Sequence, residues 1–278
     1  MRALIIYLVI SAVFIGCTPI LSIDASTQSV YHFSDTDKNI SLLDISETFG
    51  TYDGSFVLYD NNLDSWKIYN LEEATKRIPP ESTYKIYDAL LGLESGIITP
   101  EHSSMTWNGD AFPFPSWEAD QDLNSAMQNS VNWYFQAIDS QLGINRVQGF
   151  LNKIEYGNQT TSSNLDLYWS DFSLKISPLE QVTLLKKFNT NEFHLNSQNV
   201  FSVKNAIKIA STPNGNFYGK TGTGRVNGQD INGWFIGYVE TSDNSYYFAT
   251  NIQSDSNATG KKAFEITSDI LKKLHIWN

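Results

Sequence analysis

The segment PPESTYKIYDALLGLESGII, residues 79–98, decides how this chain folds and where its chemistry lies. Two prolines suit the entry to a helix better than its interior, and apolar residues then recur at helical spacing. The pattern predicts a helix that begins at Ser82, and because positions i and i+3 share a helix face, Lys85 lies beside the Ser82 hydroxyl. Burial would lower the pKa of the Lys85 amine and let it act as a base. Ser82 and Lys85 are therefore a candidate nucleophile and base, although an isolated S-x-x-K is more often an exposed turn.

Strand patterns lie on both sides of this segment, and helical patterns lie between them. Asn61 and Asn62 separate two short strand patterns, which indicates a hairpin. The predicted strands are GSFVLYD (54–60), SWKIYN (65–70), NFYGKTGTG (216–224), NGWFIGYVE (232–240) and SYYFATNI (245–252), and the predicted helices cover 122–155 in pieces, 178–188 behind Ser177, 197–209 and 260–274. Strands at both ends with helices in the middle predict an α+β fold, in which helices flank an antiparallel sheet and an all-helical insertion interrupts it.

Composition excludes several classes of protein. The chain has 278 residues, 41% of them apolar, and a formal net charge of -11. The length suffices for a large core, and the acidic balance argues against a nucleic-acid partner, which would require clustered basic residues. One cysteine and four scattered histidines give neither an internal disulfide nor a metal site, so we expect no metal.

The N-terminal 16 residues, MRALIIYLVISAVFIG, have a charged start and an apolar middle that is short for a membrane span. They predict a secretory signal, and residues 14–17 resemble a bacterial lipobox, in which the cysteine is lipidated. We therefore expect a lipoprotein-type signal peptide (1–16), a lipid on Cys17, a polar tether (17–44) and a catalytic domain (45–278). The expected location is the extracytoplasmic face of the membrane, held by lipid alone, or the secreted fraction; the alternative is a plain secretory leader.

Two further motifs, Lys220-Thr221-Gly222 and Ser130-Val131-Asn132, offer polar side chains that could bind a substrate. Lys220-Thr221-Gly222 lies on a predicted strand and presents a cation and a hydroxyl to a substrate carboxylate, while the glycine permits a close backbone approach. The next N–H, from Thr223, can pair with that of Ser82 as an oxyanion hole. Ser130-Val131-Asn132 adds a hydroxyl and an amide at a predicted helix break. Each motif alone is a weak signal.

Together, S-x-x-K, S-x-N and K-T-G at separations of 48 and 90 residues resemble the penicillin-recognising serine hydrolases. Finer matches resemble class D (oxacillinase-type) β-lactamases and the sensor domains of β-lactam receptors over about residues 45–276. The matching segments are PESTYKIYDALLGLESGII, FPFPSWEADQDLNSAMQNSVNWYFQ, Tyr156-Gly157-Asn158, YWSDFSLKISPLEQV, and YGKTGTG with NGWFIGYV. The resemblance implies the serine β-lactamase and penicillin-binding-protein transpeptidase fold.

The resemblance also implies roles for individual residues. Ser82 would open the β-lactam ring and become an acyl-ester. Lys85 would react with CO2 from bicarbonate to become N6-carboxylysine, the general base, with no other cofactor. The remaining implied catalytic roles are carbamate support by the Trp169 indole, which is otherwise a core aromatic, and proton relay by Ser130. Lys220 would be catalytic and would hold the substrate carboxylate with Thr221, and the other implied substrate-binding residues are Asn132, Gly222 and Thr223.

Two departures from the class D pattern bear on function. Class D enzymes usually have an apolar residue where this chain has Asn132, whereas the sensor domains have Asn, and this amide would favour loss of CO2 from Lys85. The usual carboxylate-anchoring arginine has no clear counterpart; Lys261 or Lys262 is the nearest candidate, with a plain surface role as the alternative.

The sequence therefore predicts a class D serine β-lactamase that confers β-lactam resistance. Hydrolysis is preferred to sensing because known β-lactam receptors carry a metalloprotease motif, H-E-x-x-H, which this sequence lacks. The alternative is a β-lactam-binding sensor that stays acylated. A third interpretation is a D,D-peptidase or transpeptidase, against which Trp169 argues. We expect β-lactams as the partners and a monomer or homodimer.

Overall fold

The computed structural model describes residues 39–278 of the chain. The predicted signal peptide, Cys17 and most of the predicted tether lie outside the described residues. The end of the tether is ordered, because residues Ile40–Leu42 form strand β1 and pair with Trp66–Ile68. Among the helices of residues 39–278, none is long and apolar enough to cross a membrane.

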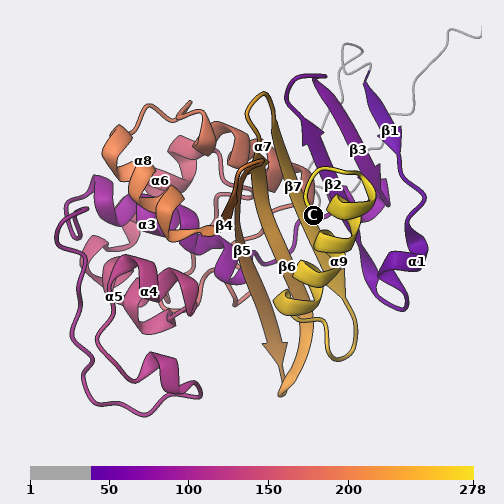
Figure 1. Ribbon diagram of the computed structural model, residues 1–278. Helices are drawn as coiled ribbons and strands as arrows, with labels where there is room; N and C mark the ends of the chain where they lie inside the picture. The colour runs from indigo at the N-terminus through magenta and orange to yellow at the C-terminus, as the bar shows by residue number, and fades with distance from the viewer. Residues whose placement is uncertain (1–38) are drawn as a thin grey trace, which may run out of the picture.

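Residues 39–278 contain a seven-stranded sheet with the order β1-β3-β2-β7-β6-β5-β4 (Figure 1). Neighbouring strands are antiparallel as predicted, except that β1 runs parallel to β3. The sheet joins both ends of the described chain, since β2 pairs with β7. The other strands are β2 (Asp53–Asp60), β3 (Ser65–Tyr69), β4 (Lys208–Thr212), β5 (Gly215–Val226), β6 (Gln229–Glu240) and β7 (Ser245–Gln253).

The central strands are buried on both faces, because successive side chains of a strand point to opposite sides. In β2, Val57 and Tyr59 contribute to one core, while Phe56 and Leu58 contribute to the other. This two-sided burial explains why the sequence of β2 is almost continuously apolar.

Helices cover the two faces unequally (Figure 1). Helix α9 (Gly260–Lys273) packs on β5, β6 and β7 over one face, next to the short α1 (Ser46–Phe49). On the opposite face α7 (Pro178–Asn189) packs on β2 and β7, and the helical insertion extends beyond β4 and β5. The remaining helices are α2 (Leu71–Thr75), η1 (Glu81–Tyr84), α3 (Lys85–Glu94), η2 (Pro115–Trp117), α4 (Leu123–Gln128), α5 (Asn132–Leu142), α6 (Ile144–Ile154) and α8 (Ser197–Ala206).

Candidate active site

The nucleophile candidate lies on the turn that leads into α3. The predicted helix start is confirmed, with the difference that the first turn, η1, is a 3-10 helix. Glu81 adopts a left-handed conformation (φ 53°), which directs the chain sharply into that turn. Ser82 is half-buried, and the Nζ of Lys85 donates a hydrogen bond to its Oγ at 2.8 Å. The sequence spacing therefore places base and nucleophile in contact.

The Lys85 side chain is buried, with 1% of its surface exposed, between the helical insertion and the loop that follows α6. Its Nζ donates to Oδ1 of Asn132 at 2.7 Å and lies 5.5 Å from the ring centroids of Phe135 and Trp169. Burial lowers the pKa of Lys85 to about 8, against the opposing effect of nearby carboxyls. The amine can therefore be neutral near physiological pH, as a base requires. The hydrogen bond to the Asn132 oxygen, however, favours its protonated form.

Ser130 and Lys220 meet on the other side of the cavity. Ser130 lies between α4 and α5 in a left-handed conformation (φ 54°), and the Nζ of Lys220 donates a hydrogen bond to its Oγ. A second bond joins this Nζ to the Thr221 carbonyl oxygen at 3.1 Å. Burial, reinforced by the charge of Lys85, lowers the pKa of Lys220 to about 7. Lys220 is thus placed to exchange a proton with the Ser130 hydroxyl.

The edge of β5 supplies the backbone groups beside Ser82. The N–H of Gly219 donates to Ile207 O (2.9 Å) across the edge next to β4. Alternate residues of a strand direct their N–H groups to the same edge, so those of Thr221 and Thr223 lie along it beyond the end of β4. Gly222 permits this close approach, because a Cβ at this position would lie 3.0 Å from the Glu81 Cβ and 3.2 Å from the Ser82 nitrogen and would displace its neighbours by a few tenths of an ångström.

Ser82, Ser130, Asn132 and the end of β5 line a cavity of about 320 Å³. It is lined by Ser82, Phe114, Ser116, Trp117, Asn129, Ser130, Asn132, Thr221, Gly222, Thr223, Arg225 and Asp230. Nine of these side chains are polar, and Phe114 and Trp117 form an apolar wall in which Phe114 remains 49% exposed. The cavity therefore combines a candidate nucleophilic hydroxyl with polar side chains and an apolar rim. This combination is typical of sites for small organic ligands.

Lys261 does not take part in this cavity. It lies exposed in the first turn of α9 and is not among the lining residues. Lys262 forms an ion pair with Glu265 on the same helix. The guanidinium that does line the cavity belongs to Arg225, which is paired with Asp230 at 2.7 Å. Arg225 is therefore the cationic residue among those that line the cavity, and a carboxylate-anchoring role for Lys261 stays a prediction.

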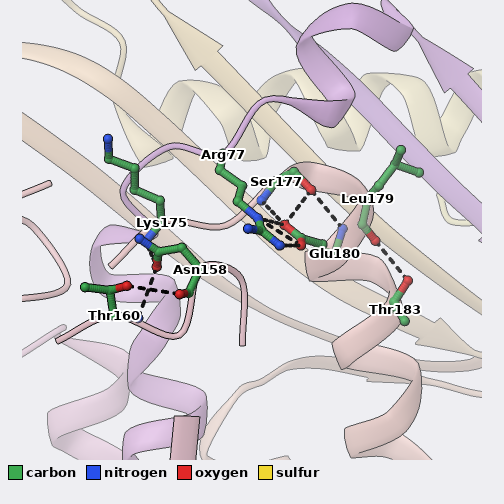
Figure 2. Close-up of polar contacts among 8 residues, drawn as sticks. All are labelled: Arg77, Asn158, Thr160, Lys175, Ser177, Leu179, Glu180 and Thr183. Carbon is green, nitrogen blue, oxygen red and sulfur yellow. Dashed lines mark hydrogen bonds and ion pairs between the residues drawn. The ribbon is translucent and has the colours of Figure 1, made fainter. Parts of the chain in front are cut away.

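A set of polar contacts lies outside the cavity, in two separate groups (Figure 2). The Nε of Arg77 donates to Glu180 Oε1 at 3.0 Å, and the same carboxylate accepts from the backbone N–H of Ser177 at 2.9 Å, capping α7. At the other end of the set, Asn158 N donates to the carbonyl of Lys175 at 2.9 Å, and Lys175 N donates to Asn158 Oδ1 at 2.9 Å. The first group fixes the segment that leads to Ser82, and the second closes the loop that carries Trp169.

Sequence reasoning missed five residues that the structure brings to the site or beneath it. They are Glu81, Asp88, Phe135, Asp139 and Arg225. Helical spacing contained the signal for three of them, since Asp88 follows Lys85 by three positions, and Phe135 and Asp139 follow Asn132 by three and seven. Arg225 follows Thr223 by two positions on the same strand, which places both side chains on one face.

Comparison with known proteins agrees with this geometry. Residues 47–272 match the penicillin binding protein transpeptidase domain. The chain is 45% identical over 277 residues to the regulatory protein BlaR1 of Bacillus licheniformis, covering 99% of this chain and 45% of that protein. It is 37% identical to the probable β-lactamase YbxI of Bacillus subtilis, covering 84% of this chain and 86% of YbxI.

A solved structure is similarly close. The C-terminal domain of the Bacillus licheniformis BlaR penicillin receptor superposes with a TM-score of 0.84 at 46% identity, covering 86% of this chain and 98% of that domain. The chain spans less than half the length of BlaR1 itself. The match to the family model, the shared fold and the similarity to both groups of relatives lead to one conclusion: the chain belongs to the penicillin-binding transpeptidase-domain family, among the class D β-lactamases and BlaR-type receptor domains.

Proposed function

We propose that β-lactams acylate Ser82 and that the acyl-enzyme is long-lived, so that the protein binds and senses β-lactams more than it hydrolyses them. The observation that carries this proposal is the 2.7 Å hydrogen bond from Lys85 Nζ to Asn132 Oδ1. An oxygen acceptor at this distance favours the protonated amine, and a protonated amine cannot react with CO2.

The acylation step follows from the contacts around Ser82. The neutral Lys85 amine takes the hydroxyl proton across the 2.8 Å contact while Oγ attacks the lactam carbonyl. The N–H groups of Ser82 and Thr223 stabilise the oxyanion. When the ring C–N bond breaks, the nitrogen takes the hydroxyl proton of Ser130, which Lys220 replaces through their hydrogen bond. The substrate carboxylate lies against Lys220 and Thr221.

Deacylation requires a base for a water molecule, and Asn132 acts against that step. A carboxylated Lys85 would supply such a base. The Nζ of Lys85 lies within cation–π distance of the Phe135 and Trp169 rings, so both these rings and the accepting oxygen of Asn132 favour the charged amine. Similarity to BlaR1 and to the BlaR penicillin-receptor domain supports the same proposal.

β-Lactam hydrolysis is the second candidate, and two observations favour it. Burial already lowers the pKa of Lys85 to about 8, so part of the protein has a neutral amine at pH 7. The chain is also similar to the probable β-lactamase YbxI. Hydrolysis, carboxylation of Lys85 and antibiotic resistance therefore remain predictions.

Intact-mass spectrometry during incubation with benzylpenicillin separates the two candidates. The proposal expects one adduct per chain that persists for many minutes and does not disappear faster with added bicarbonate. Sustained turnover of a chromogenic cephalosporin, accelerated by bicarbonate, would establish hydrolysis instead. The Ser82→Ala variant is the control and should show neither adduct nor turnover.

The proposed sensing role needs the domain outside the cytoplasmic membrane, where β-lactams arrive. Lipidation of Cys17 remains a prediction, as does a monomeric or homodimeric state. Fractionation of cells that express the Cys17→Ser variant tests the anchor: loss of the protein from the membrane fraction would support lipidation, and unchanged retention would contradict it.

A further inference from the structure

Two glycines of β5 leave room for one buried side chain, that of Glu81. Gly222 and Gly224 lie on either side of Thr223, so both point to the same face of the sheet, where η1 packs against β5. A Cβ on Gly222 would lie 3.0 Å from the Glu81 Cβ, and a Cβ on Gly224 would lie 2.9 Å from the Glu81 Cδ. Glu81 is 6% exposed. Its side chain therefore packs against the backbone on both sides of Thr223.

A chain of buried amides anchors this side chain to the sheet. Asn232, opposite Gly224 on β6, donates through its Nδ2 to Glu81 Oε1 at 3.2 Å and to the Pro79 carbonyl oxygen at 3.1 Å. The Oδ1 of Asn232 in turn accepts from the Nδ2 of Asn251 at 2.9 Å, which fixes the orientation of its amide. Both asparagines are buried. Because buried polar groups with satisfied hydrogen bonds are held rigidly, the sheet gives Glu81 a fixed anchor.

The backbone of Glu81 is also held in an uncommon conformation. Its φ of 53° lies in the left-handed region, which a non-glycine residue keeps only where the surrounding contacts impose it. Two contacts do so here. The Glu81 N–H donates to the Trp169 carbonyl oxygen at 3.0 Å, and the side chain is bound to Asn232. These contacts therefore also fix the direction of the next peptide N–H, that of Ser82.

Both N–H groups of the proposed oxyanion hole thus adjoin Glu81. Ser82 follows it in the chain, and Thr223 lies between the two glycines that its side chain contacts. The side chain of Glu81 is the spacer between the turn that carries one donor and the strand that carries the other. Such donors act only within about 2.7–3.1 Å of the oxyanion, so a change in their separation weakens the hole.

We propose that Glu81 is a positioning residue of the oxyanion hole. Its side chain, held by Asn232 beneath β5, sets the separation of the Ser82 and Thr223 N–H groups. The inference rests on the proposed acylation of Ser82, which uses these two donors. Glu81 does not line the cavity, so it acts through the two N–H groups and not through contact with the substrate.

The first test measures the affinity for phenylboronic acid, which forms a tetrahedral adduct with a serine hydroxyl and places an oxygen where the oxyanion would lie. Glu81→Gln keeps an oxygen that can accept from Asn232 and should bind as the parent does. Glu81→Gly tolerates the positive φ but has no side chain, so its affinity should fall by about tenfold or more. Gly224→Ala should weaken binding in the same way, because the new Cβ would displace the Glu81 carboxyl group.

A matched control separates this effect from a general loss of stability. Glu94→Ala removes a carboxylate at the far end of α3 that accepts from Asn196 N at 3.0 Å and from Asn199 Nδ2 at 2.7 Å. It should lower Tm and leave the boronate affinity unchanged. An unchanged affinity in Glu81→Gly and Gly224→Ala, equal losses in Glu81→Gln and Glu81→Gly, or a parent that forms no adduct would overturn the proposal.

The second readout is the ester carbonyl stretch of the benzylpenicillin adduct in the infrared, which hydrogen bonds from the hole lower. The band should move to higher wavenumber in Glu81→Gly and keep its place in Glu81→Gln and Glu94→Ala; an unmoved band in Glu81→Gly would contradict the proposal. If the boronate affinities follow the expectation but benzylpenicillin never acylates Ser82, the proposed function fails while the role of Glu81 stands.

Discussion

The Asn132→Val substitution tests the central contact of the site. It removes the oxygen that accepts from Lys85 Nζ at 2.7 Å and replaces the amide with an apolar group of similar size. A hydrogen bond to a charged group contributes about 1.5–3 kcal/mol, and one pKa unit corresponds to 1.36 kcal/mol, so its loss lowers the pKa of the amine by about 1–2 units. From about 8, the pKa of Lys85 would fall to about 6–7.

The consequence at pH 7 is a larger neutral fraction of Lys85. It rises from about one tenth to between about one half and nine tenths, a five- to ninefold change. Only the neutral amine captures CO2, so the carbamate should increase by a similar factor. The assay is the 13C NMR signal of carboxylated lysine in protein equilibrated with 13C-bicarbonate, with the half-life of the penicilloyl adduct followed in parallel by intact mass.

A control of opposite sign excludes simple loosening of the site. Asn132→Asp keeps an accepting oxygen and adds negative charge, so it should raise the pKa of Lys85 and suppress the carbamate signal. If Asn132→Val shows no more carbamate than the parent at pH 7, or if both variants change it in the same direction, then Asn132 does not control the charge of Lys85.

Four further substitutions probe the buried amine of Lys220 and the scaffold around the site. Lys220→Met should abolish acylation yet raise the stability of the fold at pH 6. The pKa of Lys220 is about 7 in the folded protein against an ordinary 10.5, so its buried charge destabilises the fold most below pH 7. The gain in Tm should therefore shrink as pH rises from 7 to 10.5. Arg77→Ala should lower the free energy of unfolding by about 1–2 kcal/mol, and a double-mutant cycle with Glu180→Gln should assign most of that loss to the pair. Gly157→Ala should cost more than about 2 kcal/mol in urea unfolding, because φ is 50° and the new Cβ would meet a backbone carbonyl at 1.9 Å; Gly149→Ala, with open space around it, should instead stabilise α6 by up to about 1 kcal/mol.

Local patterns in the sequence predicted most of the fold because each pattern had one physical solution. Ser177 was expected to begin a helix, and its hydroxyl caps α7. The hairpin across Asn61 and Asn62 also forms as predicted. The short β1 strand was missed because Ile40–Leu42 has little burial of its own. Its order comes from pairing with β3, which no local pattern encodes.

The candidate site divides in the same way. The separation of Ser82 and Lys85 by one helical turn and the position of Thr223 on a strand edge were predictable, because regular structure fixes them. The contact between Ser130 and Lys220 joins the turn between α4 and α5 to β5 across 90 residues, so only the resemblance to a known family suggested it. Lys261 lies exposed in the first turn of α9 and does not line the cavity, so its predicted role still rests on the resemblance alone.

The two buried amines of the site cannot easily be charged together, and their surroundings decide which one carries the proton. Lys220 has the charge of Lys85 as a neighbour and a pKa lowered to about 7, with no carboxyl to oppose this shift. Lys85 is equally buried, but Asp88, Glu81 and Asp139 raise its pKa back to about 8, and Asn132 accepts from its Nζ. At neutral pH the proton therefore favours Lys85, and the proposed acylation proceeds from the minor form in which Lys85 is neutral and Lys220 carries the proton. A protonated base captures CO2 poorly. A long-lived acyl-enzyme requires this state, because a carboxylated Lys85 would supply the base for deacylation.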